Sequence, residues 1–250
     1  MTSEFSVQKS AARGSRTVLA GMAPNPIRAI TIDALGTLLE LVPPAPRLRA
    51  GLRERFGLEV ADAEAGRAMR AEIGYYRAHL HLGRDQAGLA ALRRRCAEVL
   101  RDSLAAPDLD LDALTEVLLE AIRFEPFPDT VPALQELRAA GVRLIAASNW
   151  DVSLHEQLER TGLRPLLDGA VSSAEAGAAK PDPAILVRAL EIAGAEPGHA
   201  WHVGDDLEAD VGAARAAGLR PVLIDREGGI DVPAGVLRIA SLGELPALCA

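Results

Sequence analysis

Hydrophobic positions in the second half of the chain switch repeatedly between two spacings. Apolar residues at helical spacing, as in residues 131–140, give way to short apolar runs, as in residues 142–147. Short apolar runs bounded by turn residues predict buried strands, and their alternation with helices predicts right-handed βαβ units. We therefore expect an α/β fold in which a parallel sheet carries helices on both faces. The expected strands cover residues 142–147, 169–172, 200–203, 221–224 and 237–239, and the expected helices cover residues 131–140, 154–161, 183–193 and 210–217.

The first half of the chain has a different pattern. A β-rich apolar run that begins at residue 27 ends on one carboxylate, Asp33, and breaks at Gly36. Residues 47–122 then keep helical spacing almost throughout, and proline-rich segments flank them on both sides. This pattern predicts a first strand followed by an insert of about four helices, which lies on the carboxyl end of that strand.

Composition narrows the classes of function. A net charge of −8 argues against a sequence-independent nucleic-acid surface, and the 250 residues contain no apolar run long enough to span a membrane. Cys96 and Cys249 lie far apart and lack metal-site spacing, which is typical of free thiols in a reducing cytoplasm. Residues 1–26 are polar and rich in turn residues, so we expect a loose extension and hypothesise a natural start at Met22. We expect a cytoplasmic protein without nucleic-acid or membrane partners. Whether the protein forms a homodimer is left open at this point.

Polar residues gather where the predicted strands end. Because parallel strands bring their carboxyl ends to one edge of a sheet, we expect these side chains to form one site. A carboxylate can act as a nucleophile, Mg²⁺ favours carboxylate and carbonyl oxygens, and a hydroxyl near a helix start can hold phosphate. A lysine supplies a compact positive charge. The residues are Asp33, Ser148, Asn149, Lys180, Asp205 and Asp206.

Four segments around these residues resemble, in order, the four motifs of the haloacid dehalogenase (HAD) superfamily. They are Asp-Ala-Leu-Gly-Thr-Leu at 33–38, Ala-Ser-Asn at 147–149, Lys-Pro-Asp-Pro at 180–183 and Val-Gly-Asp-Asp-Leu-Glu-Ala-Asp at 203–210. The resemblance implies a Rossmann-like core with an inserted all-helical cap domain. We expect the core to comprise residues 27–42 and 126–250, and the cap residues 43–125.

The resemblance also implies a role for each motif residue. Asp33 would be the nucleophile and a Mg²⁺ ligand, joined by the Leu35 carbonyl and Asp205, with Asp206 or Asp210 nearby. Ser148 would bind the transferring group, and Lys180 would orient Asp33 and neutralise charge. Thr37 would stabilise the loop that follows the nucleophile. We expect catalytic roles for Asp33, Ser148 and Lys180, substrate contacts from Ser148, Asn149, Thr37 and Lys180, and metal contacts from Asp33, Leu35, Asp205 and Asp206.

Leu35 departs from the pattern of the family's phosphatases, which carry an acid two residues after the nucleophile. Loss of such an acid typically costs ~10² to 10⁴ in rate. One interpretation is an Mg²⁺-dependent phosphatase for small phosphorylated metabolites whose leaving groups need little protonation, such as acyl or aryl phosphates. A second is a 2-haloacid dehalogenase, because halide needs no proton, although the Gly-Asp-Asp pattern argues against it. A third is a non-catalytic relative that binds a phospho-ligand or a protein.

Overall fold

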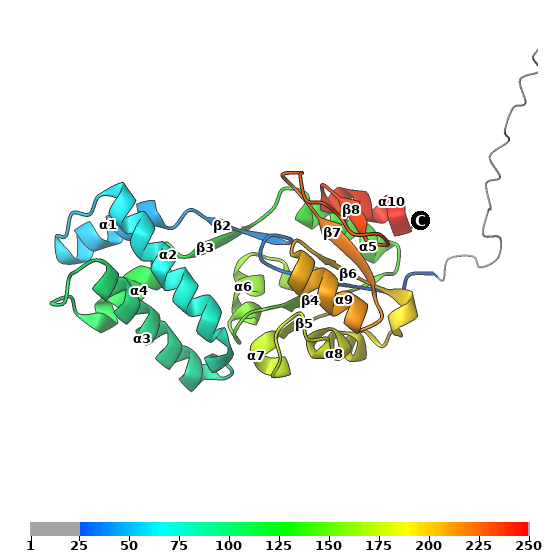
Figure 1. The fold of residues 1–250 in the computed structure, drawn as a ribbon, viewed down its shortest axis with the longest axis horizontal. Helices are drawn as coiled ribbons and strands as arrows, with labels where there is room; N and C mark the ends of the chain where they lie inside the picture. The colour runs from blue at the N-terminus through cyan, green and yellow to red at the C-terminus, as the bar shows by residue number, and fades with distance from the viewer. Residues whose placement is uncertain (1–25, 250) are drawn as a thin grey trace, which may run out of the picture.

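A six-stranded parallel sheet forms the centre of the structure, a computed structural model that describes residues 26–249. The strand order is β5-β4-β1-β6-β7-β8, and every neighbouring pair is parallel. Figure 1 shows the sheet on one side of the molecule. The predicted N-terminal extension, apart from Pro26, and the proposed start at Met22 lie outside the described residues. The strands are β1 (Ala29–Ile32), β4 (Arg143–Ser148), β5 (Gly169–Ser172), β6 (Ala200–Gly204), β7 (Arg220–Ile224) and β8 (Leu237–Ile239).

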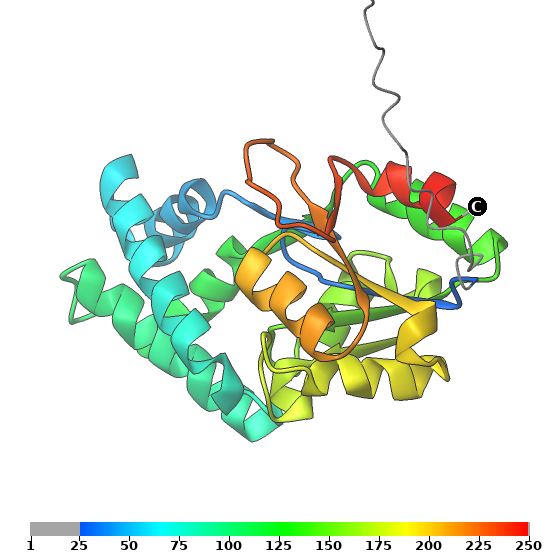
Figure 2. The same ribbon diagram turned by 45° about the vertical axis from the view of Figure 1, so that its right-hand side comes forward.

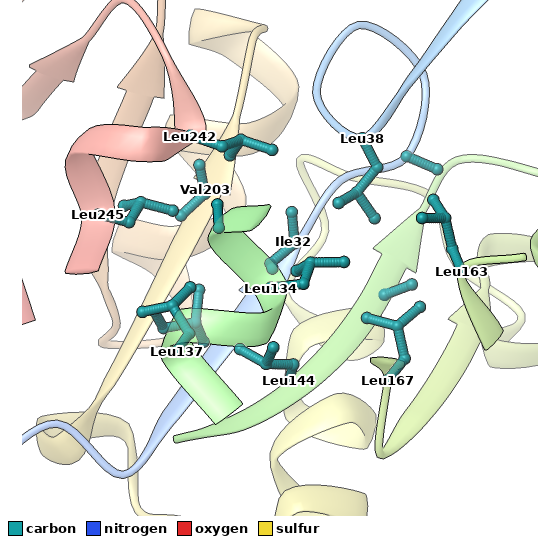
Figure 3. Packing of buried hydrophobic residues seen from close by; sticks show 14 of the residues in the cluster. Ile32, Leu38, Leu134, Leu137, Leu144, Leu163, Leu167, Val203, Leu242 and Leu245 are labelled. Carbon is teal, nitrogen blue, oxygen red and sulfur yellow. The ribbon is translucent and has the colours of Figure 1, made fainter. Parts of the chain in front are cut away.

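Helices cover both faces of this sheet, as predicted. Side chains alternate along each strand, so Ile30 and Ile32 of β1 face one layer while Ala29 faces the other. The first layer comprises α5 (Thr130–Ala139), α6 (Leu154–Arg160) and α10 (Leu245–Cys249), and the second comprises α8 (Ala184–Ala193) and α9 (Gly212–Ala216). Figure 2 shows the sheet between these layers, and Figure 3 shows Leu134 and Leu137 packed against Ile32 and Leu144. Burial on both faces explains the nearly continuous apolar runs of the central strands.

The strand order reverses between β1 and β6. Counted in chain order, the sheet runs 3-2-1-4-5-6, which is the Rossmann arrangement. From β1 the chain proceeds outward to β4 and β5, then returns to place β6 on the other side of β1. Loops after β1 and β6 therefore diverge and leave a crevice at their carboxyl ends, where ligands bind in open α/β sheets.

Four helices leave this crevice as an insert and return to it. They are α1 (Ala45–Phe56), α2 (Asp62–His79), α3 (Gln86–Ser103) and α4 (Leu111–Ala121), and they pack around a hydrophobic cluster of their own. Figure 1 shows them beside the sheet. Residues 45–121 are called the helical insert below; the division into core and cap domains stays a prediction. None of the helices between residues 26 and 249 combines the length and apolar character that a membrane crossing needs.

A two-stranded antiparallel ribbon, which the sequence pattern did not predict, joins the insert to the sheet. Its strands are β2 (Leu39–Val42) and β3 (Arg123–Pro126). Each has four residues, only Leu39 among them is buried, and prolines stand at or beside the strand ends. Four residues are too few to establish a strand pattern, and prolines are more typical of irregular connections. The ribbon gives the insert a paired connection to the sheet.

Short elements adjust the predicted boundaries. The helix expected over residues 210–217 instead begins as a π-helical turn, η4 (Leu207–Val211), which continues into α9. A further short helix, α7 (Ser173–Ala176), follows β5 because Ser172 and Glu175 form a capping box. The remaining 3₁₀ turns are η1 (Leu80–Leu82), η2 (Arg164–Leu166), η3 (Pro197–His199) and η5 (Leu242–Glu244).

Candidate active site

Asp33 lies directly after β1, at the crevice where the strand order reverses. Its N–H donates to the Val203 carbonyl at 2.8 Å, so pairing with β6 continues up to this residue. Its side chain is buried and accepts two hydrogen bonds on Oδ1, from Ser148 Oγ at 2.9 Å and from Lys180 Nζ at 2.6 Å. The three residues that the sequence named as catalytic therefore lie in direct contact.

Lys180 is the positive centre of the site. Its ammonium group donates to Asp33, to Asp210 Oδ1 at 2.6 Å and to the Ala147 carbonyl at 2.9 Å, and its side chain is 1% exposed. Burial disfavours the charged lysine, but the carboxylates of Asp33 and Asp210 outweigh burial and hold the pKa of Lys180 above its usual value. The lysine therefore stays charged and pairs with two carboxylates at once.

Asn149 holds Lys180 by its backbone. The Asn149 amide donates to the Lys180 carbonyl at 3.0 Å, and its oxygen accepts the Lys180 N–H at 2.8 Å. The motif pattern predicts that Asn149 contacts substrate, and this contact stays a prediction. In the structure both ends of the Asn149 side-chain amide bond to Lys180, so Asn149 positions the lysine.

Three carboxylates, those of Asp33, Asp205 and Asp210, crowd around this lysine. One oxygen from each lies within 4.8 Å of the others. Burial, reinforced by Asp210, raises the pKa of Asp33 to about 6 although Lys180 opposes the shift, and burial together with Asp210 also raises the pKa of Asp205. A single lysine leaves negative charge in excess, and the oxygen donors suit a hard divalent cation such as Mg²⁺. The donor set fits such an ion.

Asp210, not Asp206, is the third member of this acidic group, whereas the sequence pattern predicts Asp206 as a metal ligand. The Asp206 carboxylate caps η4 by accepting the N–H groups of Glu208 and Ala209, each at 2.8 Å. Asp210 meanwhile accepts hydrogen bonds from Lys180 and from the Asp206 N–H, and contacts His202 Nε2 at 3.0 Å. Burial would raise the pKa of Asp210, but Lys180 and His202 outweigh it and hold this pKa below its usual value.

Two glycines allow the acids to approach so closely. Gly36 has a φ of +89°, which few other residues adopt, and a side chain there would collide with the Asp205 carboxylate. A side chain at Gly204 would collide with Asp210 in the same way. The sequence shows both glycines and both acids, but it does not show which acid lies against which glycine.

Thr37 and Leu35 occupy different surroundings in the loop after Asp33. Thr37 is fully buried, and its hydroxyl donates to Asp205 Oδ1 at 3.4 Å, so its side chain contacts an acid of the site. Leu35 is only partly buried and lines the cavity described below.

Arg226 holds the same loop in place, although no pattern in the sequence indicates it. It donates to the carbonyls of Thr37 at 2.7 Å and Gly36 at 3.4 Å, and to the Asp129 carboxylate at 2.9 Å. Its guanidinium lies 3.7 Å from the centre of the Phe127 ring. One side chain thus joins the loop after the nucleophile to the segment that returns from the helical insert. Nothing in its local sequence signals this role, because its partners are distant along the chain.

A cavity of about 210 Å³ separates the helical insert from the crevice. Leu35, Asn149 and Trp150 line it on the sheet side, and Glu72 and Tyr76 line it on the insert side. The Tyr76 hydroxyl donates to Asp151 Oδ2 at 3.0 Å and so bridges the two sides. The remaining lining residues are Leu41, Ile73, Arg77, Leu80, Leu92, Arg93, Cys96, Leu118, Leu119, Ile122, Phe124, Asp151, Ser153, Glu156, Gln157 and Arg160.

Comparison with known proteins agrees with this arrangement. The family model described as haloacid dehalogenase-like hydrolase matches residues 27–218. The chain belongs to this family. The human haloacid dehalogenase-like hydrolase domain-containing protein 3 is 32% identical over 208 residues, which cover 79% of this chain and 82% of the human one. The glyceraldehyde 3-phosphate phosphatase of Methanopyrus kandleri is 36% identical over 132 residues, but the match covers only 51% of this chain and 57% of the archaeal enzyme.

Solved structures of haloacid dehalogenase-like hydrolases share the fold. A HAD phosphatase from Thermococcus onnurineus superposes with a TM-score of 0.62 and 26% identity, over 89% of this chain and 97% of that one. The L-2-haloacid dehalogenase from Xanthobacter autotrophicus gives a TM-score of 0.64 at 20% identity, over 89% of this chain and 98% of that one. Both branches of the family therefore fit the fold, and the chemistry has to be argued from the site.

Proposed function

We propose that this hydrolase is an Mg²⁺-dependent phosphatase that acts on a small phosphorylated metabolite in the cytoplasm, with Asp33 as its nucleophile. The observation that carries the proposal is the contact of Asp33 with Ser148 and Lys180 beside two further carboxylates. A site with this excess of negative charge suits a divalent cation and a phosphoryl group together. Two relatives named as phosphatases, from Methanopyrus kandleri and Thermus thermophilus, favour the same class of reaction.

In the proposed reaction, an Asp33 carboxylate oxygen attacks phosphorus and the bond from phosphorus to the leaving oxygen breaks. Water then cleaves the aspartyl-phosphate and releases inorganic phosphate. Ser148 holds a phosphoryl oxygen, while Lys180 orients Asp33 and offsets the charge that the substrate brings. Asp33, Asp205 and the Leu35 carbonyl would hold Mg²⁺, with Asp210 in the place first given to Asp206. The ion would supply positive charge opposite the transferring group.

Leu35 sets the expected leaving group. A leucine can neither protonate a departing alkoxide nor activate water, so esters of strongly basic alcohols should react slowly. Phenols and carboxylic acids leave as weaker bases. Aryl and acyl phosphates are therefore the substrates that this site is expected to turn over best.

The same leucine favours a second candidate, hydrolysis of a 2-haloacid, because halide leaves without a proton. The acidic group of Asp33, Asp205 and Asp210 works against this candidate, since three clustered carboxylates would repel an anionic haloacid unless a cation were bound. The phosphatase remains the better supported function.

A direct assay separates these functions. Metal-depleted protein is given p-nitrophenyl phosphate, acetyl phosphate, a hexose phosphate and 2-chloropropionate, with and without Mg²⁺. We expect phosphate release from the first two that needs Mg²⁺ and falls about 10⁴-fold in Asp33→Asn. Asp231→Asn, at an exposed aspartate, is the matched control and should keep full activity. Chloride release without Mg²⁺ would overturn the phosphatase, and turnover of nothing would favour a non-catalytic binding protein.

A further inference from the structure

Glu72 is a buried acid in a wall of the cavity that is otherwise mainly apolar. It lies on α2, its side chain lines the cavity, and the residue is 2% exposed. Its Oε2 atom has no hydrogen-bond partner among residues 26–249. Buried carboxyl oxygens are rarely left in this state, because the lost hydration is not replaced. A cavity-lining acid whose carboxyl group is not fully hydrogen-bonded therefore points to a ligand that supplies a donor.

The neighbours of Glu72 do not supply that hydrogen bond. The Cys96 thiol on α3 acts on the Glu72 carboxyl and lowers its pKa, but a thiol is a weak donor. Tyr76, one helical turn further along α2, directs its hydroxyl to Asp151 instead. Arg93 forms an ion pair with Glu156 at 3.7 Å. Burial raises the pKa of Glu72 to about 7, with Cys96 opposing the shift, so its charge is adjustable near neutral pH.

The cavity begins next to the reacting groups. Leu35 stands two residues after Asp33, and Asn149 and Trp150 directly follow Ser148. A phosphoryl group attacked by Asp33 would therefore lie next to this cavity, and we assign the cavity to the rest of the substrate. The volume of about 210 Å³ exceeds the ~150 Å³ cavity that holds benzene. A ring-sized leaving group would fit between Trp150 and the helical insert.

We propose, on the premise of the phosphatase function above, that Glu72 recognises a hydrogen-bond donor, an amine or a hydroxyl, on an otherwise apolar and ring-sized leaving group. The apolar wall buries the ring, and the donor satisfies the unpartnered oxygen of Glu72. Glu72 is then a specificity-determining residue. It takes no part in the transfer of the phosphoryl group.

Four matched esters test this role: phenyl phosphate and its 4-methyl, 4-hydroxymethyl and 4-aminomethyl derivatives. We expect the wild-type protein to show a KM about tenfold lower for at least one donor-bearing ester than for the methyl ester. In Glu72→Leu that ratio should fall to about one. In Glu72→Gln the preference should persist for a hydroxyl but fall for an amine, because the amide keeps an acceptor and loses the charge. Glu120→Gln, at an exposed glutamate on α4, is the control for the helical insert.

Stability gives a second readout with the opposite sign. Because Glu72→Leu removes an unpartnered buried acid, its Tm at pH 8 should rise by about 3 °C while the substrate preference is lost. Turnover with unchanged preference in Glu72→Leu overturns the role of Glu72 and leaves the phosphatase intact. A lower Tm with an equal loss on all four esters shows a merely structural residue. If the wild-type protein turns over none of the four, while Asp33-dependent release from acetyl phosphate persists, the ring-sized leaving group is wrong; without that release the phosphatase itself is wrong.

Discussion

Buried charge is handled in opposite ways at the strand ends and in the helical insert. At the strand ends, Lys180 donates to two carboxylates and a carbonyl, so every position of its ammonium group has a partner. In the insert, Glu72 is equally buried but keeps an oxygen without a partner. Groups that are satisfied within the protein hold one geometry. A group that is left unsatisfied can discriminate between ligands, because only some ligands complete it.

The largest expected effect comes from removing the lysine that pairs with the carboxylates at the strand ends. Lys180→Met should lower the free energy of unfolding by about 3–5 kcal/mol, because Asp33 and Asp210 lose their common partner while they stay buried. Urea denaturation measures the change. Arg188→Met on α8 is the control, since it removes only an exposed ion pair with Glu191 and should cost under about 1 kcal/mol. Equal effects of the two substitutions would mean that the strand-end network contributes little to folding.

In the helical insert, Glu72 should make the free energy of unfolding depend on pH. Burial raises the pKa of Glu72 from its ordinary value of 4.5 to about 7, so between these pH values the folded state holds a proton that the unfolded state has lost. The stability that it contributes is therefore present below pH 4.5 and lost as the pH rises to 7, on the order of 3 kcal/mol in all. Unfolding of the wild-type protein and of Glu72→Gln across this range measures the difference. A wild-type slope that survives in Glu72→Gln would assign it to other groups.

A smaller effect should follow from restoring an acid at the boundary between the two regions. Leu35→Asp should raise turnover of alkyl phosphates about ten- to a hundredfold, because the new carboxyl group can protonate a basic leaving group. Leu35→Asn, which has similar size but no acid, should not. Initial rates of phosphate release from a hexose phosphate measure the effect. A folded Leu35→Asp protein with unchanged or lower turnover contradicts the account of a missing acid.

The sequence predicted which residues lie at the strand ends better than it predicted the contacts within the loops. Asp33, Ser148 and Lys180 lie together as expected, because parallel strands bring their carboxyl ends to one edge. The sequence could not show whether Asp206 or Asp210 joins Asp33 and Asp205, since this depends on which acid caps η4. The catalytic roles of these residues stay predictions.

The insert shows the limit of hydrophobic patterning. Its helices were predicted from hydrophobic spacing alone. The burial of Glu72 could not be predicted in this way, because it depends on the packing of α2 against α3. The β2–β3 ribbon was missed because four residues in each strand are too few to establish a strand pattern. Arg226 was missed for a related reason, since every group it contacts is more than ninety residues away along the chain.

Arg226 has a mechanical consequence for how the insert can move. Its guanidinium ties Gly36 and Thr37, where the chain leaves for the insert, to Asp129, where the chain returns. A pivot within the ribbon leaves all of these bonds intact, whereas a pivot nearer to Asp33 has to break them. Arg226 therefore opposes bending of the chain next to Asp33 and favours bending within the ribbon. The contacts of Arg226 therefore hold the loop after Asp33 in place independently of the geometry of the ribbon.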